Sequence, residues 1–440
     1  MTNSSATGSP SHGAVPLGSG LAALREAVDE VWWYDRSDFI GAPCAGLLPS
    51  MTFEYRPYRE DSYEEMPSGP APQSYPRRVG ATFAPEHGDG AHAWARQRGL
   101  RLAAPDLKAT DRAADKITAV QLFATAQVPT PEHSIIPPDR HDRTPSAWEA
   151  LGAGAPLVVQ RRANNLVGRG TRLVESADAY DACLRDWSGE TLKATRYIHG
   201  LALTVSGCAG PDRTVVSGIS HQLVGVPDLV DSWGAHCGNQ LVGPDHLPPG
   251  VYESCQDTCR RVGDVMRAEG FRGAFGIDLV SDGHQAFAIE VNPRFQTVVG
   301  LVQAAEVAAG VLPTLGTHLL SFVTDALPEP TPAAAVPPAV SQMVVHAPQN
   351  GVLTRTVAEG CYRQTGCGLR AVERRPLAEL GDDEALIWPH ARVGDRVERG
   401  DEVALIQVSG HVADIAITPT LSERGRSWLD AVAAQTEFGP

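Results

Sequence analysis

Four polar residues near the end of an expected strand pair have the types and spacing that a metal–phosphate site needs. Glu290 and Asn292 are two residues apart on one strand, so both side chains leave the same face. Asp278 lies on the preceding strand and can face them across a hairpin. Two carboxylates and an amide oxygen form an all-oxygen site that suits Mg²⁺ or Mn²⁺. Arg294 has the same parity and could neutralise a phosphoryl group or bind a carboxylate.

The alternative to a metal site is a solvated hairpin end whose charged residues form only an incidental salt bridge. Glu290, however, lies in the apolar run A-F-A-I-E-V, where burying an unpaired carboxylate is costly, and this favours the metal site. A shared metal also requires Asp278 and Glu290 on one face. The two-residue turn that Asp282–Gly283 usually signals would put them on opposite faces. The metal site therefore predicts a shift of register by an odd number, setting Asp278 opposite Ala288 or Glu290, through an odd loop or a bulge near His284.

Upstream segments have features of a nucleotide site. Lys116 is one of only three lysines and lies in a helix expected over residues 111–127. A strand, a glycine-containing loop and a second strand follow. In that loop, glycines let the backbone approach phosphates, and neighbouring side chains can donate to their oxygens; these residues are Gly168, Arg169, Gly170 and Thr171. An ordinary hairpin turn explains this loop equally well when it is taken alone.

Taken in order, these segments resemble the ATP-grasp superfamily over about residues 110–320. G-I-D-L-V followed by E-V-N-P-R-F is similar to that family's metal-binding strand pair, and D-K-I-T-A-V to its entry helix. P-L-V-V-Q-R-R and the glycine loop resemble the part that closes over the triphosphate. K-A-T-R-Y-I-H-G at 193–200 resembles the adenine-binding hinge, and S-H-Q-L-V-G-V-P at 220–227 resembles a His-Gln segment near the nucleotide.

The resemblance implies that ATP and Mg²⁺ are the cofactors, with Mn²⁺ as an alternative. It implies metal ligation by Asp278, Glu290 and Asn292, and catalytic roles for Arg294 and Lys116. The implied nucleotide-binding residues are Lys116, Gln160, Arg161, Gly168, Arg169, Gly170, Thr171, Arg196, Tyr197, Ile198, His221 and Gln222. The family commonly has lysine where Gln160 stands and glutamate at or beside Arg196. Arg161 could supply the missing positive charge.

The branch that the chain resembles contains carboxylate–amine ligases that join amino acids or peptides, among them enzymes of natural-product biosynthesis. The resemblance implies an acyl-phosphate intermediate, small-molecule carboxylate and amine substrates, and a homodimer. One alternative is a biotin-carboxylase-like enzyme, favoured by S-H-Q and by G-D-R-V-E-R-G-D-E-V, although the chain lacks an M-K-M-type biotinylation site. A non-catalytic nucleotide-binding protein, suggested by Gln160, is the other.

Composition narrows the class of protein. The 440 residues carry a net charge of −15, which argues against coating a nucleic acid or binding an anionic membrane. The first 20 residues lack the basic and apolar regions of a signal peptide, and the apolar stretch 298–315 contains polar residues and a proline. We therefore expect a cytoplasmic protein. The eight cysteines include no C-x-x-C pair and are expected to be core or surface thiols.

The elements predict an α/β (α+β) fold with three parts. We expect a disordered leader over 1–19, an N-terminal α/β domain over 20–112, an ATP-grasp domain over 113–326 with a lid lobe at about 117–195, a proline-rich linker over 327–338 and a β-rich domain over 339–440. Spacing predicts helices over 21–33, 91–98, 111–127, 251–269 and 298–321, the last broken at Pro313. Residues 49–90 are expected to be mostly loop. A loop over 225–245 offers His236, Cys237 and Asn239 as pocket candidates.

Overall fold

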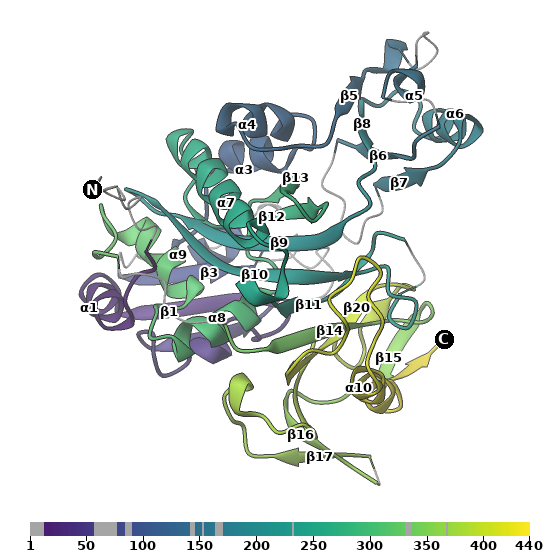
Figure 1. The fold of residues 1–440 in the computed structure, drawn as a ribbon. Helices are drawn as coiled ribbons and strands as arrows, with labels where there is room; N and C mark the ends of the chain where they lie inside the picture. Colours follow the sequence, from purple (N-terminus) through teal and green to yellow (C-terminus); the bar gives the residue numbers. More distant parts are fainter. Residues whose placement is uncertain are drawn as a thin grey trace, which may run out of the picture.

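The computed structural model describes residues 13–56, 77–83, 90–140, 146–151, 154–162, 170–230, 233–330, 337–366 and 368–440. Within them lie a ten-stranded sheet, two four-stranded sheets and a three-stranded sheet, flanked by helices (Figure 1). This is the expected mixed α/β architecture. Gly168, Arg169 and residues 331–336 of the expected linker fall outside the described residues. No helix in the described part of the chain is long and apolar enough to cross a bilayer.

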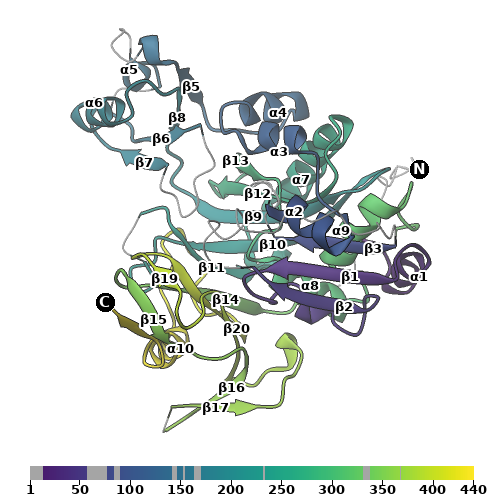
Figure 2. The same cartoon turned by 180° about the vertical axis from the view of Figure 1, so that it is seen from behind.

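The N-terminal domain contains a parallel sheet in the order β2-β1-β3-β4. Its strands are β1 (Glu30–Asp35), β2 (Met51–Tyr55), β3 (Arg78–Thr82) and β4 (Arg101–Leu102). Its helices are α1 (Leu17–Ala27), the short 3₁₀ turn η1 (Ala42–Cys44) and α2 (Gly90–Arg98). Figure 2 shows this sheet beside the larger central sheet. Aliphatic residues of β1 and α1 pack into one core with the helices of the central part.

Three expectations for this domain are corrected. The helix expected over 21–33 ends at Ala27, because the β-branched and aromatic residues Val31, Trp32 and Trp33 favour the strand β1. Strands β2 and β3 occupy parts of the segment expected to be mostly loop. The expected leader is ordered where the structure describes it: Val15 is fully buried and its carbonyl accepts from the Leu312 amide at 2.8 Å.

The entry helix is two helices, α3 (Leu107–Ala114) and α4 (Ala119–Ala126), where one was expected. The break follows from Asp115, whose carboxylate accepts hydrogen bonds from the amides of Ile117 (2.8 Å) and Thr118 (3.4 Å). This side-chain cap starts a new turn in place of continuing the first helix. Lys116 therefore lies in a turn between two helices.

The lid lobe is an antiparallel sheet in the order β5-β8-β6-β7 with its own core. Its elements are β5 (His133–Ile136), the turn η3 (Pro138–Arg140), α5 (Ala147–Ala150), β6 (Leu157–Arg161), β7 (Thr171–Val174), α6 (Ala177–Asp186) and β8 (Leu192–Arg196). Figure 1 shows it projecting from the rest of the molecule. The lobe begins at β5, later than expected, because Leu122 and Phe123 of α4 pack in the core of the central sheet.

The ten-stranded antiparallel sheet runs in the order β13-β12-β9-β10-β11-β14-β20-β18-β16-β17. Its first half consists of β9 (Leu201–Ala209), β10 (Thr214–Val224), β11 (His236–Leu241), β12 (Gly273–Ser281) and β13 (Ala286–Asn292). The turn η5 (Pro244–His246) precedes α7 (Val251–Ala268), which covers one face; α8 (Val299–Ala308) and α9 (Thr314–Val323) cover the other. Pro313 caps α9, which confirms the break expected there. Cys255 and Cys259 are buried on α7 as core thiols.

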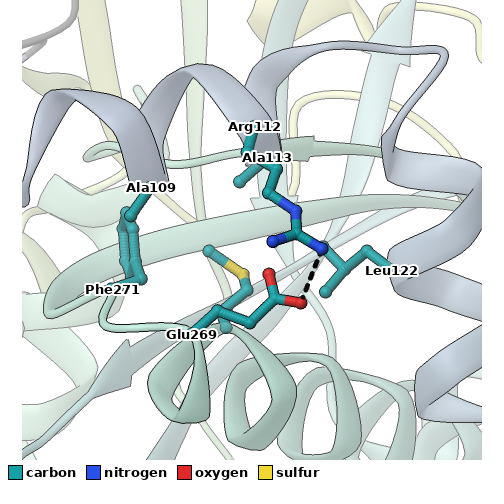
Figure 3. A pocket seen from close by; sticks show the side chains of 7 residues that line it. Ala109, Arg112, Ala113, Leu122, Glu269 and Phe271 are labelled. Carbon is teal, nitrogen blue, oxygen red and sulfur yellow. Dashed lines mark ion pairs between the residues drawn. The ribbon is translucent and has the colours of Figure 1, made fainter.

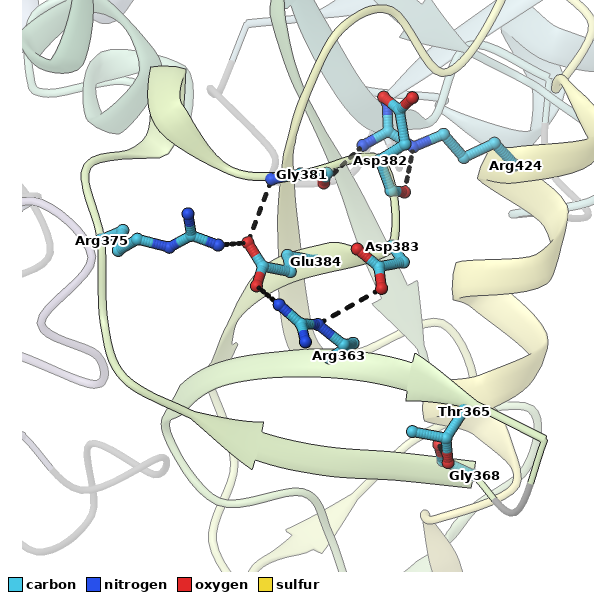
Figure 4. Close-up of polar contacts among 9 residues, drawn as sticks. All are labelled: Arg363, Thr365, Gly368, Arg375, Gly381, Asp382, Asp383, Glu384 and Arg424. Atoms are coloured by element: carbon cyan, nitrogen blue, oxygen red, sulfur yellow. Dashed lines mark hydrogen bonds and ion pairs between the residues drawn. The ribbon is translucent and has the colours of Figure 1, made fainter.

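The C-terminal part is β-rich, as expected, but it extends the central sheet. Strand β14 pairs with β11, so the sheet runs through both parts. Its elements are β14 (Val340–His346), β15 (Gly351–Arg355), β16 (Gly360–Thr365), β17 (Gly368–Val372), η6 (Leu377–Glu379), β18 (Glu384–Pro389), β19 (Arg396–Val397), β20 (Glu402–Ser409), α10 (Glu423–Ala433) and β21 (Glu437–Gly439). Around β18, Glu384 accepts hydrogen bonds from Arg363, Arg375 and the Gly381 amide (Figure 4), which ties the edge strands together.

Candidate active site

Asp278 of β12 lies directly opposite Glu290 of β13. Next to the turn, Ser281 pairs with Ala286, a register that would still put Asp278 and Glu290 on opposite faces. A bulge between Leu279 and Asp278 then shifts the register by one residue. The required odd shift is therefore present. The shift arises in the middle of β13, where Ile289 is the extra residue, and not near His284 as expected. Both carboxylates leave the same face of the sheet.

Asp278 is held by a network of hydrogen bonds. One of its oxygens, Oδ1, accepts from Thr204 Oγ1 (2.9 Å), Gln222 Nε2 (2.7 Å) and Gln296 Nε2 (3.2 Å). The other, Oδ2, accepts from Asn292 Nδ2 at 3.0 Å. These donors come from strands β9, β10 and β13 and from the segment after β13. The carboxylate is thus fixed in position by four separate side chains.

Thr204 and Gln296 were not predicted as site residues, and the structure shows why they reach Asp278. Gly276 precedes Asp278 by two residues on the same face of β12, and a Cβ there would lie 1.7 Å from Gln296 Oε1. The glycine therefore makes room for the Gln296 amide, which also donates to Thr204 Oγ1 at 2.8 Å. The signal in the sequence was the two-residue spacing of Gly276 and Asp278.

Lys116 forms an ion pair with Glu290, with Nζ 2.8 Å from Oε2, and only 3% of the lysine is exposed. Burial would raise the pKa of Glu290, but the charge and hydrogen bond of Lys116, with the nearby Lys193, outweigh burial and hold that pKa below its usual value. Glu290 is therefore a carboxylate at neutral pH. The turn between α3 and α4 places Lys116 directly over the end of β13.

Asp278 and Lys193 have shifted pKa values for the same reason. Burial, reinforced by the facing charge of Glu290, raises the pKa of Asp278 to about 6. Burial also lowers the pKa of Lys193 to about 8, and its repulsion from Lys116 acts in the same direction while Glu290 opposes it. Four ionisable groups thus share a site from which water is largely excluded.

Asn292 and Arg294 complete the group on β13 and the turn after it. Asn292 is buried, and its Oδ1 accepts from Arg294 Nη2 at 3.2 Å. The guanidinium lies 5.5 Å from the ring centre of Phe83, and its positive charge opposes part of the rise in the pKa of Asp278. The two facing carboxylates fit a hard divalent cation, since two like charges otherwise oppose each other. The Asn292 amide lies beside them with Nδ2 toward Asp278 and Oδ1 toward Arg294, so its oxygen would join the ligand set only after the amide turns over.

The lid lobe turns one face toward these residues. On that face Gln160 lies directly opposite Lys193 of β8 and, on its other side, opposite Thr171 of β7. Lys193 Nζ donates to the Ile289 carbonyl of β13 at 3.2 Å. A small pocket at this junction is lined by Val120, Phe123, Thr130, Pro131, His133, Lys193, Thr195, Ala288 and Ile289. The lid and the central sheet therefore meet beside Glu290.

Arg161 and Arg196 are not brought to this face. Arg161 alternates with Gln160 along β6 and forms two 2.7 Å hydrogen bonds with Glu190. Arg196 donates to the Leu151 carbonyl (2.6 Å) and pairs with Glu132 (2.9 Å). The expectation that Arg161 replaces the missing charge is not met, because strand alternation points it toward the other side of the lid.

The hinge candidates lie where the lid joins β9. The Tyr197 amide donates to the Pro156 carbonyl at 3.0 Å, and its ring lies 6.4 Å from that of the exposed Trp233. Ile198 follows in the same extended segment. Gly200 is required there, since a Cβ would lie 2.3 Å from the Ser281 carbonyl oxygen of β12. The hinge thus packs closely on the central sheet.

Of the His-Gln pair, only Gln222 reaches the site. His221 points to the other face of β10, where its ring nitrogen Nε2 lies 3.0 Å from the Ala416 carbonyl, and burial lowers its pKa to about 4. Adjacent strand residues cannot share a face. His236, Cys237 and Asn239 are also strand residues of β11, not loop residues, and Asn239 is buried.

A second pocket lies on the other side of the entry helices (Figure 3). Its lining comes from α3, α4 and the end of α7, and consists of Ala109, Arg112, Ala113, Leu122, Met266, Glu269 and Phe271. An ion pair of 3.0 Å between Arg112 and Glu269 spans it. None of the predicted site residues contributes to this pocket.

Comparison with known protein families shows which family these residues match. The family described as an ATP-grasp domain matches residues 113–298, which include the end of α3, α4, the lid, β9 to β13 and every residue of the cluster around Asp278. Residues 113–298 form an ATP-grasp domain. This confirms the family that the sequence resembles. A D-alanine–D-alanine ligase from Desulforudis audaxviator (strain MP104C) is 25% identical over 240 residues, which are 52% of this chain and 74% of the ligase.

Solved structures of ATP-grasp enzymes share the fold well beyond this domain. A carboxyaminoimidazole ribonucleotide synthase from Aspergillus clavatus, solved with ATP, has a TM-score of 0.59 at 14% identity and covers 93% of this chain and 99% of its own. The biotin carboxylase domain of the Hydrogenobacter thermophilus 2-oxoglutarate carboxylase, solved with MgADP, ADP and bicarbonate, has a TM-score of 0.60 at 13% identity, covering 93% and 90%. The N-terminal and C-terminal parts therefore belong to the shared fold.

Proposed function

We propose that this protein is an ATP-dependent ligase that joins a carboxylate to an amine through an acyl phosphate, with amino acids or a small peptide as substrates. The observation that carries this proposal is the gathering of Lys116, Glu290, Asp278 and Asn292 where the lid meets the central sheet. The likeness to a D-alanine–D-alanine ligase supports a carboxylate–amine reaction.

The site's charges fit transfer of a γ-phosphoryl group. Such a transfer needs positive charge beside the phosphate oxygens, and Lys116 and Arg294 are two of the cations next to the carboxylate pair. The substrate carboxylate attacks the γ-phosphorus and releases ADP. The amine then attacks the acyl carbon and releases phosphate. No protein nucleophile is required, because the substrate carboxylate provides it.

Asp278, Glu290 and Asn292 would hold Mg²⁺, which supplies charge neutralisation for the triphosphate when bound. The network from Thr204, Gln222 and Gln296 orients the Asp278 carboxylate for this task. The face of the lid that carries Gln160 and turns toward the central sheet would cover the nucleotide and exclude water, which otherwise hydrolyses an acyl phosphate. We further infer a cytoplasmic enzyme, where ATP is supplied. A homodimer and a role in natural-product biosynthesis stay predictions.

The test is phosphate release by the full-length protein with MgATP and pairs of amino acids, with mass spectrometry of the product. A ligase gives phosphate and an amide in equal amounts. The variant Glu290→Gln serves as control and should abolish both. A second arm with biotin and bicarbonate tests the carboxylase alternative, which the biotin carboxylase fold favours. Phosphate release only in that arm, or release in neither arm, would overturn the ligase proposal.

A further inference from the structure

The lid carries a buried cation that the sequence patterns did not single out. Lys193 of β8 is 3% exposed, and Gln160, directly opposite on β6, is 4% exposed. Directly opposed residues of an antiparallel pair point to the same side. Thr171 extends this row on β7. Three polar side chains therefore cross the lid sheet in one line.

This row faces the central sheet and not the interior of the lid. The alternate residues of the same strands, among them Leu157, Val159 and Ala194, form the lid's core against α6. Lys193 points the other way, and its Nζ reaches the carbonyl of Ile289, next to Glu290. The bulge that sets Asp278 opposite Glu290 leaves Ile289 unpaired in the ladder, so its carbonyl is available to the lysine.

The contacts of Lys193 leave room for an anion. An ammonium group has three donors, and the Ile289 carbonyl accepts one of them. A neutral carbonyl balances a buried charge only in part. Gln160 is also incompletely satisfied, because its Oε1 is buried without a hydrogen-bond partner while its Nε2 donates to Thr171 Oγ1 at 3.3 Å. Rotation of this amide would exchange its oxygen and nitrogen, which frees the N–H donors from Thr171 and lets the Thr171 hydroxyl donate to Oε1.

We propose that Lys193 is the lid's triphosphate-contacting cation, so that the charge lies on β8 while Gln160 on β6 contacts the phosphates as a neutral donor. This inference rests on the proposed ATP site. It explains how a lid with Gln160 at its centre supplies positive charge, because Arg161 is paired with Glu190 on the opposite face. Lys116, between α3 and α4, and Lys193, on the lid, would then contact the phosphates from two sides.

The test is calorimetry of ATP and AMP binding to the full-length protein in the presence of Mg²⁺. Lys193→Met should weaken ATP binding about 10- to 100-fold, the usual effect of one charged hydrogen-bond pair, and leave AMP binding nearly unchanged. The matched control is Lys108→Met, which removes an exposed lysine of α3 and should leave both affinities unchanged. The double variant Gln160→Lys/Lys193→Gln moves the charge across the row and should restore most of the ATP affinity.

Unchanged ATP affinity in folded Lys193→Met would overturn the inference. An equal loss of ATP and AMP binding would also overturn it, since that pattern indicates a structural role. If Lys193→Met does not fold, Lys193→Arg is measured in its place, because it keeps the charge. The ratio of its ATP affinity to its AMP affinity should stay within about threefold of the wild-type ratio. Collapse of that ratio would contradict the inference. If the wild type itself binds no ATP, the proposed function fails first, which separates the two outcomes.

Discussion

Asp278 and Glu290 oppose each other across the β12–β13 hairpin only because a bulge shifts the strand register by one residue. Without the bulge, the two carboxylates would leave opposite faces of the sheet and could not share a cation. The extra residue, Ile289, also presents the carbonyl that Lys193 contacts. One irregularity in a strand thus brings together groups from the central sheet and from the lid.

Lys116 should matter for both catalysis and folding. Lys116→Met removes the partner of a largely buried carboxylate, so we expect turnover to fall by at least about 100-fold and stability by about 1–3 kcal/mol. Denaturant unfolding and phosphate release measure the two effects. The double variant Lys116→Met/Glu290→Gln should regain stability but not turnover. Stability unaffected by the single change would contradict the buried ion pair.

Gly276 should be intolerant of even a methyl group. In Gly276→Ala the new Cβ collides with the Gln296 amide, which must move away from Asp278 and Thr204. We expect a loss of about 1–3 kcal/mol in thermal or denaturant unfolding, together with weaker Mg²⁺-dependent ATP binding. Gly18→Ala is the matched control, since an added Cβ there meets nothing within 4 Å; it should be neutral or slightly stabilising. Equal behaviour of the two variants would refute the close contact.

Glu306 should make stability depend on pH. Burial raises its pKa to about 7, against an unfolded value of 4.5, while Thr314 donates to it. Since the folded value is the higher one, its stabilising contribution is complete below pH 4.5 and is lost as pH rises through 7. Wild type should therefore lose up to about 3 kcal/mol relative to Glu306→Gln between pH 4.5 and 8. Unfolding curves at several pH values measure this; Glu253→Gln, at an exposed position of α7, should follow the wild type throughout.

The site could be predicted from sequence where short-range rules sufficed. The two-residue spacing of Glu290 and Asn292 fixes their common face, and the demand for a shared cation predicted the odd register shift. The position of the bulge could not be predicted, because no residue type near Ile289 marks it and the contact that its carbonyl makes, with Lys193, comes from a residue 96 positions earlier in the chain. Lys193 was missed for a related reason: its role follows from a cross-strand neighbour 33 residues earlier, Gln160.

At three other places, the spacing or pairing read from the sequence was overruled by a different local preference of the chain. Helical spacing over 111–127 gave one helix, but the Asp115 carboxylate caps a new turn and splits it. Spacing over 21–33 gave another, but β-branched and aromatic residues end it at Ala27. The His-Gln pair was expected to act together, although alternation along β10 allows only Gln222 to face Asp278. In each case a side-chain cap, a cluster of strand-forming residues or the two-residue period of a strand decided the outcome.

The most direct test of the central claim follows oxygen from substrate to phosphate. The full-length protein is incubated with MgATP and a mixture of amino acids carrying ¹⁸O in their carboxyl groups, and the released phosphate is analysed by mass spectrometry. A ligase that forms an acyl phosphate transfers one ¹⁸O to each phosphate and yields an amide, and Asp278→Asn should release neither. Amide formation with unlabelled phosphate, or release of AMP in place of ADP, would contradict the account.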